Sequence, residues 1–157
     1  MDDTNDVTVD FARLADLEPM ADLLTELFTL ESDFMPVRAK QLAGLRLILE
    51  QPTIGQLFVL RIDDKVAGMA NALFTVSTAE GRRVIVLEDV IVNARYRGCG
   101  YGRRLIEHIA RWAAANGLPR ITLLADQDNA PALAFYQRLG FELSGMRVLR
   151  THLAAAG

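Results

Sequence analysis

Residues 84–92 read Val-Ile-Val-Leu-Glu-Asp-Val-Ile-Val, a nearly continuous apolar run that carries two consecutive acids, Glu88 and Asp89. A strand with one face in water alternates apolar and polar side chains, whereas a strand covered on both faces is apolar along its length. The run therefore predicts a central strand of a sheet with helices on both faces. A chain built around such a strand folds as a layered α/β domain.

The spacing of apolar residues elsewhere in the chain predicts the remaining elements. Strands are expected over 7–11, 56–62, 66–76, 84–92, 121–125 and 141–150, the last as a strand or hairpin. Helices are expected over 16–28, 36–51, 105–113 and 129–139. The predicted order is β-α-α-β-β-β-α-β-α-β, a mixed α/β arrangement in one domain over residues 1–157.

The charge balance and the single cysteine exclude several kinds of partner and site. The chain has 17 Lys and Arg against 20 Asp and Glu, so its net charge of −3 provides no positive field for nucleic acid. Cys99 stands alone, which leaves no internal disulfide and no thiolate metal site. The acidic N-terminus is unlike a signal peptide, and no apolar run could span a bilayer. We therefore expect a soluble cytoplasmic protein with no metal, nucleic-acid or membrane partner.

A glycine-rich segment follows the apolar run. Residues 97–103 read Arg-Gly-Cys-Gly-Tyr-Gly-Arg and precede a predicted helix. Alternating glycines let the backbone approach a ligand closely, and the start of a helix offers unpaired amides and the positive end of its dipole. The segment is typical of a phosphate-binding turn, with Arg97, Arg103 and Arg104 adding positive charge nearby. A purely structural turn is the alternative.

Two well-known phosphate loops fit this segment poorly. The nucleoside-triphosphate loop requires Gly-Lys followed by Ser or Thr, and the chain has no such triplet. The dinucleotide fingerprint requires a further glycine where Arg103 stands, although Asp126 after the following strand resembles its ribose-binding acid. A dinucleotide site therefore stays a weak alternative.

Two segments together resemble the GNAT superfamily of N-acetyltransferases. One is Arg-x-x-Gly-x-Gly at positions 97, 100 and 102, which is similar to the acyl-CoA-binding motif of that superfamily. The other is residues 129–141, Asn-Ala-Pro-Ala-Leu-Ala-Phe-Tyr-Gln-Arg-Leu-Gly-Phe, which resembles its second signature. The resemblance covers residues 84–142 and implies a mixed, mostly antiparallel central sheet, splayed in the middle, with helices on both faces.

The resemblance also implies where acetyl-CoA, the acetyl donor, would bind. In the superfamily the pantetheine arm lies in the gap of the splayed sheet and pairs with exposed backbone. By position, this backbone belongs to Val90, Ile91 and Val92, and Asn129 would contact the cofactor beyond the thioester. The pyrophosphate would be held at the glycine-rich turn, whose residues are Arg97, Gly98, Cys99, Gly100, Tyr101, Gly102 and Arg103.

The acids of the apolar run are candidates for the proton transfer. Only about one part in a thousand of a primary amine is neutral at pH 7, and only that form attacks a thioester. Adjacent side chains of a regular strand point to opposite faces, so both acids reach one cleft only if a bulge interrupts the strand. Our hypothesis is that Glu88 is the general base, directly or through water, and that Asp89 binds or orients the cationic acceptor. The alternative is a structural salt bridge to Arg82 or Arg83.

Two further side chains have expected roles. Tyr136 resembles the tyrosine with which family members protonate or hydrogen-bond the departing CoA thiolate, and an aromatic pair with Phe135 is the structural alternative. Because a phenol is a weaker acid than a thiol, hydrogen bonding is the main contribution expected of Tyr136. Cys99 lacks an activating neighbour in the sequence, so we expect it to be a small loop residue and not a nucleophile.

The resemblance implies acetyl transfer from acetyl-CoA to the amine of a small molecule by direct attack in a ternary complex. By family analogy, residues 27–51 cover the acceptor side of the cleft, with contacts expected from Glu31, Asp33, Phe34 and Arg38. Alternatives are a protein lysine or N-terminal acetyltransferase and a non-catalytic CoA-binding sensor. A homodimer is a further expectation, through pairing of the last strand at residues 146–149.

Overall fold

The computed structural model describes residues 5–31 and 35–155. The chain forms two compact units, Met1–Leu124 and Ala125–Gly157. The strands of the first unit are β1 (Val7–Phe11), β2 (Gly55–Ile62), β3 (Lys65–Ser77), β4 (Arg82–Val92) and β5 (Ile121–Leu123). Its helices are α1 (Leu17–Leu30), α2 (Arg38–Glu50) and α3 (Tyr101–Ala115), with short 3-10 helices η1 (Leu14–Asp16) and η2 (Ala94–Tyr96). The second unit holds α4 (Ala130–Arg138).

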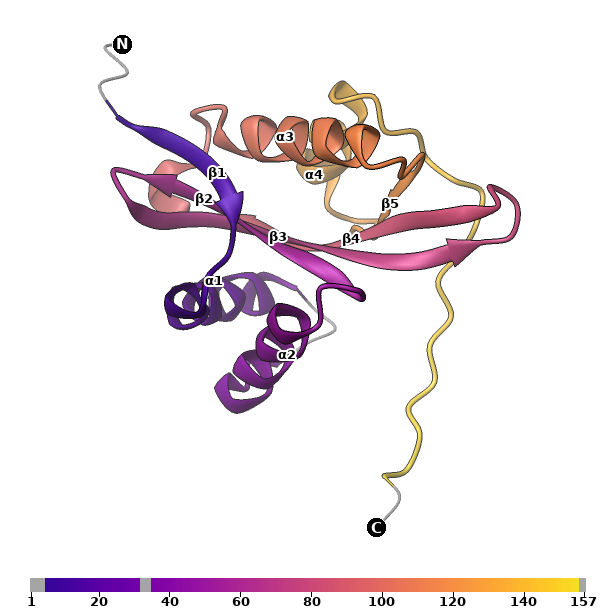
Figure 1. The fold of residues 1–157 in the computed structure, drawn as a ribbon, viewed down its shortest axis with the longest axis horizontal. Helices are drawn as coiled ribbons and strands as arrows, with labels where there is room; N and C mark the ends of the chain where they lie inside the picture. Colours follow the sequence, from indigo (N-terminus) through magenta and orange to yellow (C-terminus); the bar gives the residue numbers. More distant parts are fainter. Residues whose placement is uncertain (1–4, 32–34, 156–157) are drawn as a thin grey trace. The chain divides into compact units, whose positions relative to one another are not determined.

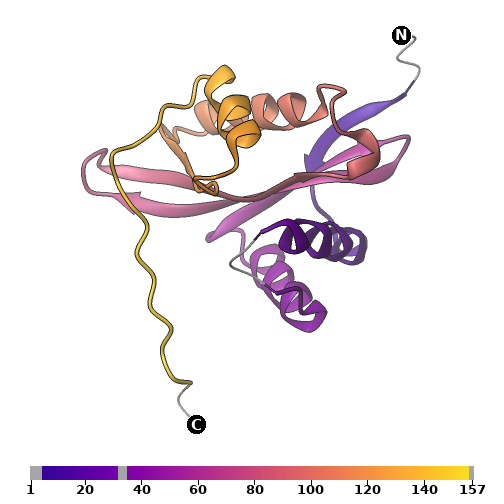
Figure 2. The ribbon, with the colours of Figure 1, turned by 180° about the vertical axis from the view of Figure 1, so that it is seen from behind.

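The five strands form one sheet in chain order, from β1 at one edge to β5 at the other (Figures 1 and 2). Strands β1 to β4 pair antiparallel, and β5 pairs with β4 in parallel. The predicted hairpin between β2 and β3 turns at Asp63 and Asp64, whose φ angles of 50° and 65° suit a tight hairpin turn. A parallel pair needs a crossover connection, which α3 provides.

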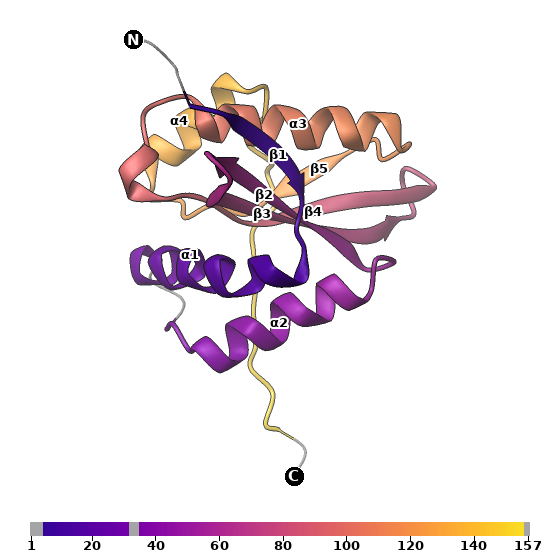
Figure 3. The same ribbon diagram turned by 60° about the vertical axis from the view of Figure 1, so that its left-hand side comes forward.

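Helices cover both faces of the sheet: α1 and α2 lie on one face and α3 on the other (Figures 1 and 3). Side chains of β2 alternate between these faces. Leu57 and Val59 belong to the apolar core formed with α1 and α2, whereas Phe58 packs on Trp112 of α3 with ring centroids 5.2 Å apart. Trp112 also lies against Phe11 and Phe74, at 5.9 and 6.1 Å. The prediction of a central strand covered on both faces is confirmed.

The sheet opens beside the second half of β4. The parallel pairing joins Ile85, Val86 and Leu87 to residues 121–123 and goes no further. Residues 88–92 of β4 continue along β3 but have no β5 partner on their other side. The strand therefore has a free edge directly after Leu87, which is the splay that the family resemblance implies.

The predicted last strand or hairpin over residues 141–150 is wrong. Residues 141–155 form neither helix nor strand. A strand exists only when its amides and carbonyls meet a neighbouring edge, and apolar content alone does not supply one. The large side chains of this segment are exposed, at 69% for Leu143, 90% for Met146, 91% for Leu149 and 86% for Leu153. In the second unit, α4 confirms the helix predicted over 129–139.

Candidate functional site

A β-bulge sits where the two acids interrupt β4. Met69 of β3 is opposite Ile91 and Asn71 is opposite Glu88, so Asp89 and Val90 together face a single residue of β3. Asp89 has a φ of 54°, in the left-handed region that few non-glycine residues adopt. The bulge predicted as the condition for both acids to serve one site is therefore present, and it re-aims the chain at Asp89.

Burial and neighbouring charges act on the Asp89 carboxyl group. Burial, with the negative charges of Glu88 and Glu31, raises the pKa of Asp89 to about 7. Asn71 opposes this shift, because its Nδ2 donates to Asp89 Oδ2 at 2.5 Å and stabilises the charged form. An acid with this pKa is close to half ionised at neutral pH, so it can take up or release a proton there.

The structural alternative for the two acids finds no support. Among the described residues, no ion pair joins Glu88 or Asp89 to Arg82 or Arg83. The Arg83 guanidinium lies instead over the ring of Phe74, 5.8 Å from its centroid. Glu88 is exposed and Asp89 is half-buried, so the pair lies at the surface of the open part of the sheet.

The glycine-rich turn has the conformation of a backbone anion site. Gly98 and Gly100 have φ angles of 77° and 84°, and a Cβ atom at either would meet nothing within 4 Å. Glycine is therefore required at these positions by backbone conformation and not by space. Gly100 is the N-cap of α3, and no side chain caps this helix end. The first amides of α3 thus lack a side-chain partner, as a phosphate site requires.

The basic side chains around the turn are engaged with protein atoms. Arg97 donates from Nη2 to Glu26 Oε1 at 2.6 Å and from Nε to the Val92 carbonyl oxygen at 3.0 Å. Arg103 donates to Glu107 at 2.7 Å, one turn further along α3. An anion at this turn would therefore meet backbone amides more readily than guanidinium groups.

Three remaining residues of the turn differ in exposure. Cys99 is exposed, with its Sγ 3.7 Å from the Arg97 carbonyl oxygen, and no acid or histidine activates it among the described contacts. Tyr101 is buried, and its ring packs edge-on against Tyr96 at 6.2 Å. Gly102 lies in the first turn of α3. The expectation that Cys99 serves only through its backbone stays a prediction.

Glu26 is a site residue that sequence reasoning missed. Its Oε1 accepts from the Ala94 amide at 2.8 Å as well as from Arg97, so α1 holds the segment between β4 and the turn. In the sequence, Glu26 is one polar residue among several on a predicted amphipathic helix. The packing of α1 against β4 brings Glu26 to this segment, and no local sequence pattern predicts that contact.

Asn129 and Tyr136 lie in the second unit. Asn129 is the N-cap of α4 and accepts from the Ala132 amide at 3.2 Å, so its side chain has a structural duty. The ring of Tyr136 lies between two aromatic neighbours, with centroids 5.1 Å from Phe135 and 5.7 Å from Phe141. The aromatic pairing expected as the structural alternative is therefore present, and the acid role stays a prediction.

The residues expected on the acceptor side differ in their positions and contacts. Glu31 follows α1 and acts on Asp89, as the pKa of that acid shows. Arg38 begins α2 and pairs with Glu18 and Asp22 of α1, which makes it a surface ion-pair partner. Asp33 and Phe34 lie outside the described residues.

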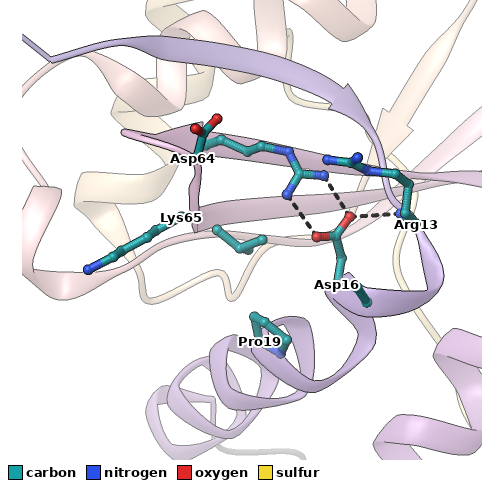
Figure 4. Close-up of a pocket in the computed structure, with 8 residues that line it drawn as sticks. Arg13, Asp16, Pro19, Asp64 and Lys65 are labelled. Atoms are coloured by element: carbon teal, nitrogen blue, oxygen red, sulfur yellow. Dashed lines mark hydrogen bonds and ion pairs between the residues drawn. The ribbon is translucent and has the colours of Figure 1, made fainter.

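A pocket of about 520 Å³ lies elsewhere in the first unit, at the start of α1 and the turn between β2 and β3 (Figure 4). Arg61 and Asp16 form a buried bidentate ion pair in its wall, with distances of 2.7 and 2.8 Å. The Arg13 amide also donates to Asp16, at 2.7 Å. None of the residues lining this pocket belongs to the site around Asp89. The charged groups of Arg61 and Asp16 in the pocket wall are therefore bonded to each other, as in a structural ion pair.

Within residues 5–31 and 35–155, no cluster of three or more His, Cys, Asp or Glu side chains is placed to hold a metal ion. In the same part of the chain, no helix combines the length and apolar character needed to cross a bilayer.

A protein family and several curated proteins are similar to this chain. The acetyltransferase (GNAT) family matches residues 18–141. Streptothricin acetyltransferase of Streptomyces lavendulae is 34% identical over 84 residues, which is 54% of this chain and 42% of that protein. The chain spans less than half the length of the first curated relatives that it matches.

Solved structures share the fold. A possible acetyltransferase from Clostridium difficile 630 gives a TM-score of 0.86 at 18% identity, covering 95% of this chain and 99% of that one. A predicted acetyltransferase with acetyl-CoA, from Clostridium acetobutylicum, gives 0.75 at 12% identity, covering 93% and 96%. Likeness at such identities concerns the fold alone. The family match, however, covers most of the chain. The chain therefore belongs to the acetyltransferase (GNAT) family, whose acetyl donor is acetyl-CoA.

Proposed function

We propose that this chain transfers the acetyl group of acetyl-CoA to the amine of a small cationic molecule, by direct attack in a ternary complex. One observation carries the proposal: Asp89, with a pKa of about 7, lies in a bulge where β4 has lost its β5 partner. A general base is most effective when its pKa lies near the working pH. Family membership supports acetyl-CoA as the donor.

The donor binds along the free edge of β4 in this proposal. The pantetheine arm pairs with the backbone of Val90, Ile91 and Val92, and the Val92 carbonyl keeps its bond from Arg97. The pyrophosphate binds the amides of residues 98–103, which the left-handed glycines and the uncapped start of α3 leave available. Asn129 contacts the donor beyond the thioester, through atoms that its N-cap bond does not use.

The two acids have different roles in the proposed reaction. The ammonium group of the acceptor releases a proton to the Asp89 carboxylate, and the neutral nitrogen attacks the thioester carbonyl. A C–N bond forms as the C–S bond breaks, and the nitrogen passes its remaining excess proton to the departing CoA thiolate, which leaves as the thiol. Tyr136 stabilises the thiolate by a hydrogen bond or relays that proton, giving up its own and regaining the one from nitrogen. The sequence favours Glu88 as the base, but the raised pKa favours Asp89. We therefore propose Asp89 as the base and the exposed Glu88 as the group that attracts the cationic acceptor.

The charge around Asp89 supports a cationic acceptor. Glu88 and Glu31 both act on Asp89, so three acids share one region of the first unit. Positively charged acceptors are attracted to such a region, and anionic ones are repelled. The name of the relative from Streptomyces lavendulae, streptothricin acetyltransferase, supports a small-molecule amine, whereas peptidyl-lysine N-acetyltransferase YjaB of Escherichia coli supports the protein amine that is the alternative.

The test is a screen for CoA release from acetyl-CoA over polyamines, aminoglycosides, amino sugars, amino acids and peptides. With the best acceptor, Asp89→Asn should lower kcat by about 10²- to 10⁴-fold while the Kd of acetyl-CoA stays unchanged. Asp64→Asn is the matched control, because Asp64 lies at the separate pocket and asparagine tolerates its left-handed backbone. Unchanged turnover in Asp89→Asn would contradict the base assignment.

Glu88→Gln separates the two acids and the competing activities. Loss of its negative charge should raise the KM of the acceptor and lower the pKa of Asp89, so the acidic limb of kcat/KM moves to lower pH. If the limb vanishes instead, Glu88 is the base. A chain that accepts only peptides would be a protein acetyltransferase. Binding of acetyl-CoA with no turnover on any acceptor would indicate a sensor.

We further propose that both units form one acetyltransferase domain, since the family match runs across the boundary between them. We propose a homodimer as well, in which residues 146–149 lie against a second copy. This segment has the apolar content of a strand and leaves its large side chains exposed. A reducing cytoplasmic setting suits the single exposed Cys99.

A further inference from the structure

Asn71 is a buried amide in an apolar stretch of β3. It is 3% exposed, and its chain neighbours Ala70 and Ala72 are fully buried. The register places it opposite Glu88, one residue before the bulge. Its Nδ2 donates to Asp89 Oδ2 at 2.5 Å. Its Oδ1 is buried without a hydrogen-bond partner among the residues that the structure describes. An unsatisfied buried polar atom destabilises the folded state, so packing alone does not explain an amide here.

The two atoms of this amide match the two protonation states of a carboxyl group. An ionised carboxylate only accepts hydrogen bonds, and the Nδ2 group supplies a donor. A protonated carboxyl group also carries an O–H donor, for which Oδ1 is an acceptor. A half-turn about the Cβ–Cγ bond exchanges Nδ2 and Oδ1 in almost the same volume. Asn71 can therefore serve Asp89 before and after it takes up a proton.

Within residues 5–31 and 35–155, no cation is among the groups that shift the pKa of Asp89. The charged groups that act on Asp89 are Glu88 on its own strand and Glu31 after α1, and both disfavour the carboxylate. Among the described contacts, the hydrogen bond from Asn71 on β3 is the one interaction that favours the ionised form. Asp89 thus depends on a neutral partner, Asn71, which can either donate to the carboxylate or accept from the protonated carboxyl group.

We infer that Asn71 is a positioning residue for the proton transfer: its amide donates to the Asp89 carboxylate and, after a half-turn, accepts from the protonated carboxyl group. The proton that leaves the acceptor ammonium stays on Asp89 Oδ2 and is shared with Asn71 Oδ1 until solvent removes it. This inference rests on the proposed role of Asp89 as the base.

Asn71→Leu removes both polar atoms from a side chain of nearly the same shape. The pKa of Asp89 should rise by about one unit, because the carboxylate loses its donor. In the enzyme, kcat/KM at pH 7 should fall about fivefold and recover toward the wild-type value at pH 9, as the acidic limb moves upward. Asn71→Asp should move the limb further, since two neighbouring carboxyl groups then share a proton.

The Asp89 titration is also measured without turnover, by ¹³C NMR of the side-chain carboxyl in the unliganded protein, with the signal assigned by its loss in Asp89→Asn. Ser77→Ala is the matched control: it removes a buried polar group from the same strand, far along the register from Asp89, and should leave the titration unchanged. If Asn71→Leu does not fold, Asn71→Ala removes the same atoms with less bulk.

The outcomes separate the two proposals. An Asp89 titration that stays in place in both Asn71→Leu and Asn71→Asp overturns the inference, as does a uniform loss of activity with no movement of the limb. If the titration moves but no acceptor is acetylated by the wild-type protein, the proposed function fails and the pairing of Asn71 with Asp89 stands.

Discussion

Asp16 and Asp89 are both shielded aspartates, yet their surroundings move their pKa values in opposite directions. Burial raises the pKa of both, but hydrogen bonds from the Arg61 guanidinium and the Arg13 amide outweigh burial at Asp16 and lower its pKa. At Asp89 the neighbours are Glu88 and Glu31, so burial and charge act together. A carboxyl group paired with a cation stabilises the fold, whereas one beside other acids is ready to take up a proton.

Asp16→Asn should lower the free energy of unfolding by about 3 kcal/mol at pH 7, because Arg61 keeps a buried charge and loses its bidentate partner, with only the more distant carboxylate of Asp10 left at 3.8 Å. Since folding depresses the pKa of Asp16, its contribution is present above its ordinary value of 3.8 and is lost as pH falls through the folded value. The difference between wild type and variant should therefore shrink below about pH 4. Urea denaturation at pH 7 and at acid pH measures it.

The control is the double variant Asp16→Leu with Arg61→Met, which replaces the whole ion pair by apolar side chains. It should recover most of the lost stability, because an apolar pair leaves no buried charge. If the single variant costs less than about 1 kcal/mol, the pair contributes no more than a surface salt bridge.

At the scale of elements, the proposed anion site lies at a junction between β4, η2 and α3, which contacts from α1 hold in place. The N-cap of η2 is Asn93, whose side chain accepts from the Arg95 amide at 3.0 Å, and Glu26 of α1 holds the next residue. The turn then passes through two left-handed glycines into an uncapped helix start. The amides of the turn are thus positioned by contacts outside the turn itself.

Gly100→Ala should weaken CoA binding about tenfold. A side chain at a φ of 84° is strained by about 1 kcal/mol, and relief of that strain rotates the first amides of α3 away from a common centre. Isothermal titration with CoA measures the Kd. Gly44→Ala is the control: Gly44 lies within α2 with open space around it, so alanine should stabilise the helix and leave the Kd unchanged. Equal Kd values for both variants would contradict an amide site at Gly100.

At the scale of the whole chain, the sequence predicts what local patterns determine. Hydrophobic spacing predicts the helices and the strands β1 to β5, and two adjacent acids in one strand make a bulge the condition for both to reach one cleft. Asn71, Glu26 and Glu31 act through sheet register and helix packing, which join residues far apart in sequence. For the same reason, residues 141–150 have the composition of a strand but not its structure, because the partner edge is not encoded within the segment.

The proposed homodimer is a property of assembled chains, and the mass of the protein in solution tests it. Wild-type protein should elute with twice the monomer mass in size-exclusion chromatography with light scattering. Replacing Met146 and Leu149 by lysine should give a monomer, because each removes a large exposed apolar side chain from the segment. Val76→Lys, at an exposed apolar residue of β3, should leave the mass unchanged. A monomeric wild type, or a dimer that survives the double change, would contradict the proposed interface.

The aromatic cluster on the α3 face has an optical consequence. Trp112 is the one tryptophan of the chain, and its indole lies against rings from β1, β2 and β3. Its intrinsic fluorescence therefore reports the docking of α3 on three strands at once. The helix that begins at the proposed anion site thus carries, near its far end, a tryptophan whose emission reports whether that helix is docked on the sheet.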